Sequence, residues 1–239
     1  MHGLLAIESS QRAISVAIRC RDGSIVQRNP IGDPREKDLL LPAIVALCAD
    51  ANIARSELRA IAISTGPGGF TGLRVGIATA KGMCEALSIP AIDVPSAMVA
   101  AMGVRSQWWP RARQVVVALA AKGEECWMTT IDADEAGELS VRSAQWSRWN
   151  VENVIGFGTA MVLIADDHLP VEIRQRAIDT GMTILPPTFQ ASDCLAVAEA
   201  MLLRGEVTDS LGLRVRYPRE PEAVTIWRAR YPDGFTPKK

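Results

Sequence analysis

The sequence predicts an α/β protein built from two similar halves. Short apolar runs with the two-residue period of strands alternate with longer segments whose apolar residues recur every three or four positions, as in helices. A pattern of three strands opens the chain and recurs in its second half. The length of 239 residues suits one or two domains. Helices must cover both faces of a partly parallel sheet, which also favours an α/β architecture.

Composition indicates a globular protein with no bulk affinity for nucleic acid or membranes. The net charge of -1 excludes a protein that coats nucleic acid electrostatically, and the 48% apolar content supports a sizeable core. No run of apolar residues reaches the roughly 20 that a membrane helix needs. The chain enters a strand-like segment directly after Met1-His2-Gly3, without a signal peptide, so we expect a cytoplasmic protein without a membrane partner.

The first part of the chain is predicted to form an antiparallel meander. Leu4–Glu8 and Ala13–Cys20 have strand patterns, and Ile25–Arg28 returns as a third strand after the Asp22-Gly23 turn signal.

A helix follows between Asp38 and Ala51, and it is apolar on two faces. One face carries Leu40, Ile44, Leu47 and Ala51, and the other carries Leu41, Val45 and Cys48. Such a helix needs two packing partners.

The remainder of the first half is predicted to alternate strand and helix. Ala60–Thr65 is a buried strand, a Gly-rich loop leads into a helix over Thr71–Leu87, and Ala91–Val94 is a further strand. Ser96 is placed to cap a helix that runs to about Met102. The segment Gly103–Arg113 has the character of a boundary.

Beyond that boundary the same order recurs. We expect strands at 115–119, 126–131 and up to 145, then strands at 161–165 and 182–185 with helical segments between them, and a final helix at 192–203. A meander followed by alternating helix and strand, present twice, is the layout of the two-domain actin-like (ASKHA) fold shared by sugar kinases and chaperone ATPases. We therefore predict an N-terminal domain over residues 1–104 and a second, divergent domain over 105–205. Residues 206–239 form an extension expected to pack on the first domain.

The Gly-rich loop Ser64–Arg74 is the segment most suggestive of chemistry. Backbone N–H groups of glycines and a helix N-terminus together suit an anion, so Glu8, Ser9, Gly66, Gly68, Gly69 and Thr71 are candidates for an anion or nucleotide loop. The loop is not a Walker A motif because no Lys follows its glycines, and Thr71 breaks the pattern G-x-G-x-x-G. The alternative is that the glycines only allow a tight turn and close helix packing, with Thr71 as N-cap.

The helix after this loop carries an apolar stripe flanked by small residues. The stripe consists of Leu73, Ile77, Ala80 and Cys84, and Gly76, Ala78 and Gly82 lie beside it. Small residues let another helix approach closely, so the stripe is either internal core or a subunit seam.

The sequence has few residues that could bind a metal ion or form a Ser-His-Asp triad. The five cysteines are scattered singly, and the two histidines, His2 and His168, are far apart in the chain. We predict no metal site and no catalytic residues. The tail mixes Arg228, Arg230 and other basic residues with Trp227 and Tyr231, which could track nucleic acid, although a solvated extension is the simpler interpretation. The pair Trp146 and Trp149 is interpreted as core or domain seam rather than a ligand platform.

Several motifs together resemble the bacterial TsaB (YeaZ) family. They are Leu5-Ala6-Ile7-Glu8-Ser9-Ser10, the segment Leu39-Leu40-Leu41-Pro42, the long stretch from Ile61 through the Gly-rich loop to Gly82, and Ile89-Pro90 before a strand. The resemblance covers about the first hundred residues, is weak over 105–205, and returns at Tyr217–Ala223.

The resemblance implies an actin-like, non-catalytic subunit needed for threonylcarbamoylation of the adenosine beside the anticodon of tRNA. Family members pair with the catalytic subunit TsaD and the ATPase TsaE, pair with themselves, and reach tRNA through the complex. The resemblance implies no cofactor of the chain's own, with ATP or ADP at the complex interface. The first two helices are the family's pairing surface, so the implied interface residues are Leu40, Ile44, Leu47, Leu73, Arg74, Ile77, Ala80 and Cys84.

Two departures from the family pattern stand out. Glu8 replaces the usual Asp, and Lys37-Asp38 stands where a His is usual, which puts any inherited phosphate or cation geometry in question. Two other classes of function compete with the subunit interpretation. One is a stand-alone actin-like phosphotransferase or ATPase that uses Glu8 and the Gly66–Thr71 loop, and the other is a metalloprotease, which lacks ligands.

Overall fold

The computed structural model describes residues 2–29, 39–120, 125–148, 162–216 and 222–231, and it contains two five-stranded sheets. The strands of the first sheet are β1 (Leu4–Glu8), β2 (Ser15–Arg19), β3 (Ile25–Arg28), β4 (Ala60–Ser64) and β5 (Ala91–Val94). The strands of the second sheet are β6 (Gln114–Ala120), β7 (Glu125–Ala133), β8 (Leu139–Arg148), β9 (Val162–Ala165) and β10 (Thr183–Leu185). The helices are α1 (Leu40–Asp50), α2 (Phe70–Leu87), α3 (Ser96–Gly103), α4 (Arg105–Trp108), α6 (Val171–Asp179), α7 (Ala191–Leu203) and α8 (Glu222–Arg230), and a 3₁₀ turn, η1, covers Arg55–Glu57.

The two sheets have the same topology, so the predicted duplication is confirmed. The strand order is β3-β2-β1-β4-β5 in the first sheet and, read from the matching edge, β8-β7-β6-β9-β10 in the second. In both sheets the first three strands pair antiparallel, and the last two are added parallel to the first strand. This is the α/β, actin-like arrangement that the sequence pattern predicted.

The central strands of the first sheet are buried on both faces because helices cover each side. Successive side chains of a strand point to opposite faces. Accordingly, Leu5 and Ile7 of β1 join the core under α1 and α2, whereas Leu4 and Ala6 join the core on the other side. The continuous apolar run of β1, with no polar alternation, is the sequence signature of such a strand.

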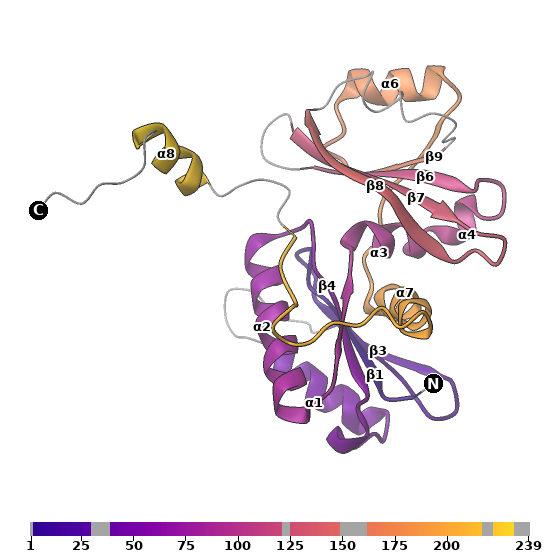
Figure 1. Cartoon of the computed structure of the whole chain (residues 1–239). Helices are drawn as coiled ribbons and strands as arrows, with labels where there is room; N and C mark the ends of the chain where they lie inside the picture. Colours follow the sequence, from indigo (N-terminus) through magenta and orange to yellow (C-terminus); the bar gives the residue numbers. More distant parts are fainter. Residues whose placement is uncertain (1, 30–38, 121–124, 149–161, 217–221, 232–239) are drawn as a thin grey trace, which may run out of the picture.

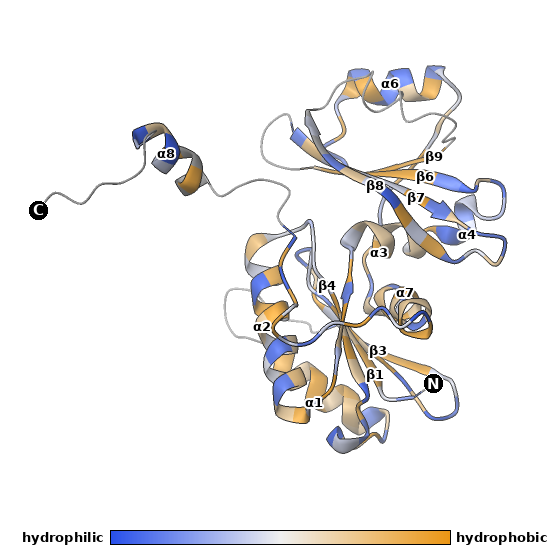
Figure 2. Cartoon of the chain, in the orientation of Figure 1, coloured by the Kyte–Doolittle hydropathy of each residue, from blue (hydrophilic) through white to orange (hydrophobic). Residues whose placement is uncertain are grey.

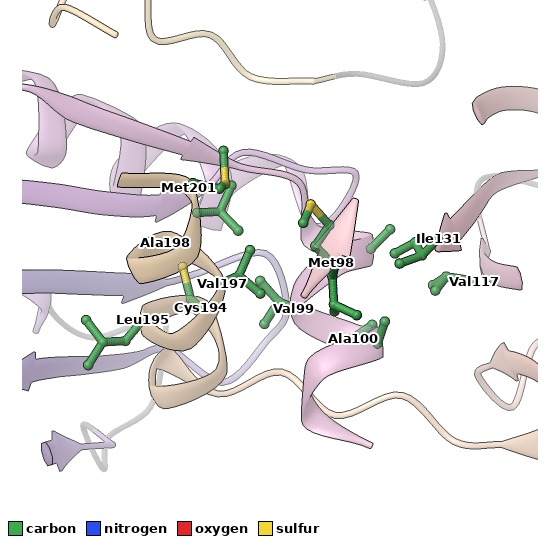
Figure 3. Close-up of a cluster of buried hydrophobic side chains, with 14 of the residues drawn as sticks. Met98, Val99, Ala100, Val117, Ile131, Cys194, Leu195, Val197, Ala198 and Met201 are labelled. Carbon is green, nitrogen blue, oxygen red and sulfur yellow. The ribbon is translucent and has the colours of Figure 1, made fainter. Parts of the chain in front are cut away.

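The molecule is layered, with α3 and α7 lying between the two sheets (Figure 1). The helices α1 and α2 cover the far face of the first sheet, and α6 covers the far face of the second (Figure 1). Figure 3 shows the middle layer, where Met98 and Val99 of α3 lie between Val197 of α7 and the second-sheet residues Val117 and Ile131. One core therefore joins both halves of the chain.

The placement of α7 differs from the predicted grouping of residues 105–205. The helix forms where the periodicity predicted it, but it packs on the first sheet, against β1 and β2. The first two backbone N–H groups of α7 donate hydrogen bonds to side chains of that sheet. The Ala191 N–H donates to Ser15 Oγ at 2.9 Å, and the Ser192 N–H donates to Gln27 Oε1 at 2.9 Å. The chain thus returns after the second sheet, and α7 covers one face of the first sheet.

Two predicted helix caps are wrong, and one predicted boundary is structured. The N-cap of α2 is Gly69, so Thr71 lies inside the helix, and Ser96 is the first helical residue of α3 rather than its cap. The Ser96 hydroxyl instead accepts a hydrogen bond from the Gly66 N–H at 3.0 Å. Within Gly103–Arg113, the buried Trp108 donates its Nε1–H to the Ala101 carbonyl at 3.0 Å, so this segment is part of the core.

Residues 206–216, hereafter the strap, run back along the first half. Thr208 exchanges backbone hydrogen bonds with Ala91, and Leu213 is buried in the core beneath α1 and α2. At the end of the strap, Arg216 donates its backbone N–H to the Thr65 carbonyl at 2.7 Å. Beyond it α8 stands away from both sheets (Figure 1).

Candidate functional site

The Gly-rich loop before α2 packs against the residues that follow β1. A Cβ on Gly68 would lie 2.2 Å from the Ser10 carbonyl oxygen, and one on Gly72 would lie 2.3 Å from the Ser9 carbonyl oxygen. The Gly69 N–H donates to the Ser10 carbonyl at 2.7 Å. These glycines therefore allow two backbone segments to touch, which favours the packing alternative for the loop.

Glu8 lies fully buried at the end of β1, under this loop. Its Oε1 accepts hydrogen bonds from Ser10 N at 2.7 Å and from Ser10 Oγ at 2.6 Å, while its Oε2 has no hydrogen-bond partner among the described residues. Burial raises the pKa of Glu8 because a carboxylate loses hydration there, and the bonds from Ser10 oppose this shift. A buried acid offers no attraction to phosphate.

The six residues predicted for an anion or nucleotide loop do not share one environment. Glu8, Ser9 and Gly66 are buried, and Gly68, Gly69 and Thr71 are exposed. Gly66 adopts a φ of +114°, which favours glycine, and lines a cleft between the two halves.

The apolar residues predicted for the interface face the wrong way to be a contact surface. Seven of the eight predicted residues are buried in the core between the two helices and the first sheet: Leu40, Ile44, Leu47, Leu73, Ile77, Ala80 and Cys84. The strands of the first sheet cover these side chains, because an amphipathic helix packs an apolar stripe on its sheet. Only Arg74 of the predicted set is exposed.

A second set of residues on the same helices does face outward. Leu41 and Val45 of α1 are 48% and 69% exposed, and Phe70 at the start of α2 is 55% exposed. Arg74 lies over the Phe70 ring, with its guanidinium carbon 3.6 Å from the ring centroid. We call these exposed or half-exposed residues of the two helices the α1–α2 outer face, and they are Leu41, Val45, Cys48, Ala49, Phe70, Arg74, Ala78 and Gly82.

The sequence carried a signal for this surface. Leu41, Val45 and Cys48 formed the second apolar face of the first predicted helix, for which a second partner was expected. In the structure the sheet takes the first face, and the second is exposed or half-exposed. The α1 ribbon is hydrophobic over most of its length in Figure 2, consistent with a helix that is apolar on both sides.

Two kinds of feature are absent from the part of the chain that the structure describes: a cluster of metal-ligating side chains and a helix able to cross a membrane. Those residues contain no group of three or more His, Cys, Asp or Glu side chains placed to hold a metal ion. None of the described helices combines the length and the apolar character needed to cross a bilayer.

A comparison with family models identifies the chain. The model described as "TsaD: tRNA N6-adenosine threonylcarbamoyltransferase" matches residues 35–214, which is well over half of the 239 residues. The chain belongs to the TsaD family. The match begins just before α1 and ends in the strap, so it spans the outer face, β4 and β5 of the first sheet and the whole second sheet.

Named relatives place this TsaD-family chain with TsaB, also called YeaZ. It is 29% identical over 136 residues to the tRNA threonylcarbamoyladenosine biosynthesis protein TsaB of Escherichia coli, which is 56% of this chain and 57% of that protein. It is 27% identical over 165 residues to TsaB of Haemophilus influenzae, which is 69% of each chain. An uncharacterized protein of Mycobacterium leprae is 37% identical over 107 residues, 43% of this chain and 29% of that protein. The predicted TsaB resemblance is thereby confirmed.

A solved structure extends this likeness in shape over nearly the whole TsaD-family chain. YeaZ from Pseudomonas aeruginosa superimposes with a TM-score of 0.72, covering 91% of this chain and all of that one, at 23% sequence identity. At that identity the comparison establishes the shared fold. The second half, where the sequence resemblance is weak, therefore has the same architecture.

Proposed function

We propose that the chain is a non-catalytic subunit of tRNA threonylcarbamoyladenosine biosynthesis that binds a TsaD-type catalytic partner through the α1–α2 outer face. In this role it stabilises or activates the partner, which modifies the adenosine beside the anticodon. The observation that carries the proposal is the exposed apolar set of Leu41, Val45 and Phe70 on two neighbouring helices. The names of the curated TsaB relatives supply the pathway.

The chemistry of the outer face suits a partner built from helices. Large apolar residues lie on α1 and at the start of α2, whereas the rest of the α2 part of the face presents the small residues Ala78 and Gly82, and a Cβ on Gly82 would meet no atom within 4 Å. A ridge of large side chains beside a surface of small ones lets a second pair of helices pack closely. Arg74 at the edge supplies a cation for a polar rim.

The outer face also supports self-pairing. The same apolar surface can be covered by a second copy of the chain when the catalytic partner is absent, so we propose a homodimer that exchanges into the mixed complex. We further propose that TsaE joins this complex, that tRNA is reached through the partner, and that ATP or ADP acts at the shared interface rather than on this chain alone.

The arrangement around Glu8 supports a non-catalytic role. A catalytic carboxylate needs access to its substrate, and Glu8 is fully buried with one oxygen bonded by Ser10. Of the glycines that would cradle phosphate, Gly68 and Gly69 are in contact with the backbone of Ser10, and Gly66 lies against the backbone of Arg216. The stand-alone phosphotransferase or ATPase is therefore not favoured.

Substitution of Val45 by Glu tests the proposed interface. Val45 is exposed, so Val45→Glu is expected to leave the monomer folded but to block pairing, because an unpaired charge in an apolar interface costs several kcal/mol. Val171→Glu is the matched control, since Val171 is 75% exposed on α6, far from this face. Light-scattering chromatography with TsaD, with and without ATP, reads out the complex. Normal complex formation by folded Val45→Glu would overturn the proposed surface.

A further inference from the structure

The helix α8 contributes no residue to the buried cores of the part of the chain that the structure describes. It stands away from both sheets (Figure 1). The backbone N–H of Arg216, at the end of the strap, donates to the Thr65 carbonyl at 2.7 Å and so fixes where the extension leaves the molecule. Thr65 directly precedes the Gly-rich loop, so α8 projects from the end of the molecule where α2 begins. Phe70 and Arg74 of the outer face lie at that same end of α2.

The end of the chain carries a charge opposite to that of the rest. Residues 214–239 contain seven Lys or Arg residues and three Asp or Glu residues, which gives a net charge of +4. Since the whole chain has a net charge of -1, the first 213 residues have a net charge of -5. A basic segment at one end of an acidic protein is typical of an arm that binds a polyanion.

The cations of this basic segment are presented to solvent. Arg228 and Arg230 are exposed and belong to the last turn of α8, whereas Glu222, the acidic residue of the helix, is its first residue. Arg214 of the strap is also exposed, and its guanidinium donates to backbone carbonyls of the strap, which carry no net charge. The last turn of α8 therefore has a net positive charge.

Two aromatic rings lie on the same face of α8 as its arginines. Trp227 is 48% exposed, and its ring centroid lies 4.5 Å from that of Tyr231, with the ring planes tilted by 46°. The Tyr231 N–H donates to the Trp227 carbonyl at 2.9 Å, so helical spacing extends to Tyr231. With about 3.6 residues per turn, the order around the helix is Arg230, Trp227, Tyr231, Arg228. The two guanidinium groups thus flank an aromatic pair.

This arrangement suits single-stranded nucleic acid better than a protein groove or a membrane surface. A helix that docks on protein or lipid keeps its charges on the face opposite its apolar residues. On α8 the cations stand beside the rings instead. Guanidinium groups bind phosphates, and an aromatic ring stacks on any base because every base has a π-face. Bases within a duplex are already stacked on one another, so the ring pair requires unpaired bases.

From this arrangement we infer that α8 binds an unpaired stretch of RNA directly. The two arginines contact phosphates, and the rings of Trp227 and Tyr231 stack on bases. The inference rests on the proposed function for the identity of the RNA, which is a tRNA held by the catalytic partner. It goes beyond that function because this chain itself adds a contact to the tRNA. The extension leaves the molecule beside the outer face, where the partner is proposed to bind.

Photo-crosslinking tests the position of the contact. An unmodified tRNA transcript is irradiated with the full chain, alone and in complex with TsaD, and mass spectrometry locates the attached nucleotides. Crosslinks are expected at Trp227 or Tyr231, and a fully paired RNA duplex is expected to give few at these residues. Crosslinks confined to other residues, or no crosslink to the chain in either sample, would overturn the inference.

The salt dependence of affinity tests the role of the arginines. In the complex with TsaD, the double variant Arg228→Ala and Arg230→Ala is expected to weaken tRNA binding about tenfold. It should also reduce the slope of log K against log salt by about 1.4, since each single-strand phosphate contact contributes about 0.7. The matched control replaces Arg111 and Arg176, two exposed arginines outside α8, and should change neither value. Equal effects of the two double variants would contradict the inference.

Two substitutions of Trp227 distinguish base stacking from apolar packing. Trp227→Phe keeps a ring and is expected to retain most of the tRNA affinity. Trp227→Leu keeps an apolar side chain without a ring and is expected to weaken binding about tenfold. Because α8 lies outside the buried cores, both variants should melt within about 2 °C of the wild type. Equal tRNA binding by the two variants would rule out stacking and with it the inference.

The same variants show whether α8 binds protein or lipid instead. Loss of TsaD pairing by the arginine variant, with wild-type tRNA affinity, would make α8 a protein-docking helix and refute the inference. Binding of the chain to phosphatidylglycerol vesicles as tightly as to tRNA would refute it as well.

The proposed function is tested independently of α8. Val45→Glu leaves α8 intact, so the free variant is expected to crosslink to tRNA at α8 although it no longer pairs with TsaD. Normal pairing by Val45→Glu would overturn the proposed interface alone, whereas loss of the α8 crosslink in the wild-type chain would overturn the RNA contact alone.

Discussion

At the scale of single residues, two glycines of α2 lie in opposite surroundings and should respond oppositely to alanine. Gly72→Ala would bring a Cβ to 2.3 Å from a backbone carbonyl, which must shift, so we expect a loss of about 1 to 3 kcal/mol. Gly82→Ala meets no atom within 4 Å, so removal of a flexible residue from a helix should add about 0.5 to 1 kcal/mol. Urea unfolding of both variants measures the difference. Equal effects would show that α2 does not approach Ser9 closely.

Glu8 should make stability fall as the pH rises. Burial raises its pKa above the ordinary 4.5, so the folded state holds the proton more tightly than the unfolded state. Its contribution is therefore fully present below about pH 4.5 and is lost as the pH rises through the raised pKa. Glu8→Gln removes this dependence. Unfolding free energies measured from pH 4 to 8 should show the variant gaining on wild type as the pH increases.

Asp193 contributes in the same direction and needs its own control. Burial raises the pKa of Asp193 from 3.8 to about 6, so its contribution also declines as the pH rises over that interval. Asp193→Asn therefore shows which part of the wild-type pH dependence arises between pH 4 and 6. A difference between Glu8→Gln and wild type that stays constant over the whole range would contradict the role given to Glu8.

At the scale of elements, α7 depends on caps that come from distant strands. The Ser15 hydroxyl accepts from the Ala191 N–H at 2.9 Å in a buried position. Ser15→Ala leaves that N–H without its partner and should cost about 1 kcal/mol. Ser140→Ala, at an exposed position of β8, should change stability by less than about 0.5 kcal/mol. Thermal melts of both variants check this, and an unchanged melt for Ser15→Ala would mean that the cap is dispensable.

The spacing of apolar residues sufficed to predict most helices and strands, because each of them buries one face and the residues of that face recur at a regular interval in the sequence. It could not decide which apolar face of α1 meets the sheet, since Leu40 and Leu41 belong to stripes of similar character. Nor could it show that Gly68 before α2 and Gly72 within α2 touch Ser10 and Ser9, because that contact joins segments about 60 residues apart. For the same reason no short segment of the sequence predicts the cleft between the two halves, because its walls come from the loops around Gly66 and Pro95, from β7 and β8, and from Arg216.

The correction at α1 and α2 changes which substitutions test the interface. Leu47→Glu and Ile77→Glu would have been chosen as interface variants from the sequence pattern, but both side chains are buried in the core. A buried unpaired carboxylate is strongly destabilising, so we expect both variants to be unfolded or insoluble. Circular dichroism should separate them from Val45→Glu, which is expected to keep its native spectrum. Native spectra for Leu47→Glu and Ile77→Glu would place the helices differently on the sheet.

At the scale of the whole molecule, the return of α7 makes the first half depend on residues from the end of the second. Residues of α7 and α3 share one core with β6 and β7, so neither sheet is covered on its inner face without them. The bidentate pair between Arg19 of β2 and Glu199 of α7, at 2.6 and 2.5 Å, adds a polar tie across the same contact. The two halves should therefore unfold together.

Two truncations test this coupling. A chain that ends at Gln190 lacks α7 and the strap, so it exposes the inner face of the first sheet and should fail to fold, with loss of its cooperative melt. A chain that ends at Arg216 keeps α7, the Thr208–Ala91 pairing and buried Leu213, and loses only α8 and the residues around it. We expect it to melt in a single transition within about 2 °C of the full chain, since α8 stands away from both sheets. Calorimetry on the two truncated chains and on the full chain tests this. A cooperative transition for the chain that ends at Gln190, or two separate transitions for the full chain, would show that the two halves fold independently. In either case the packing of α7 on the first sheet would not be required for folding.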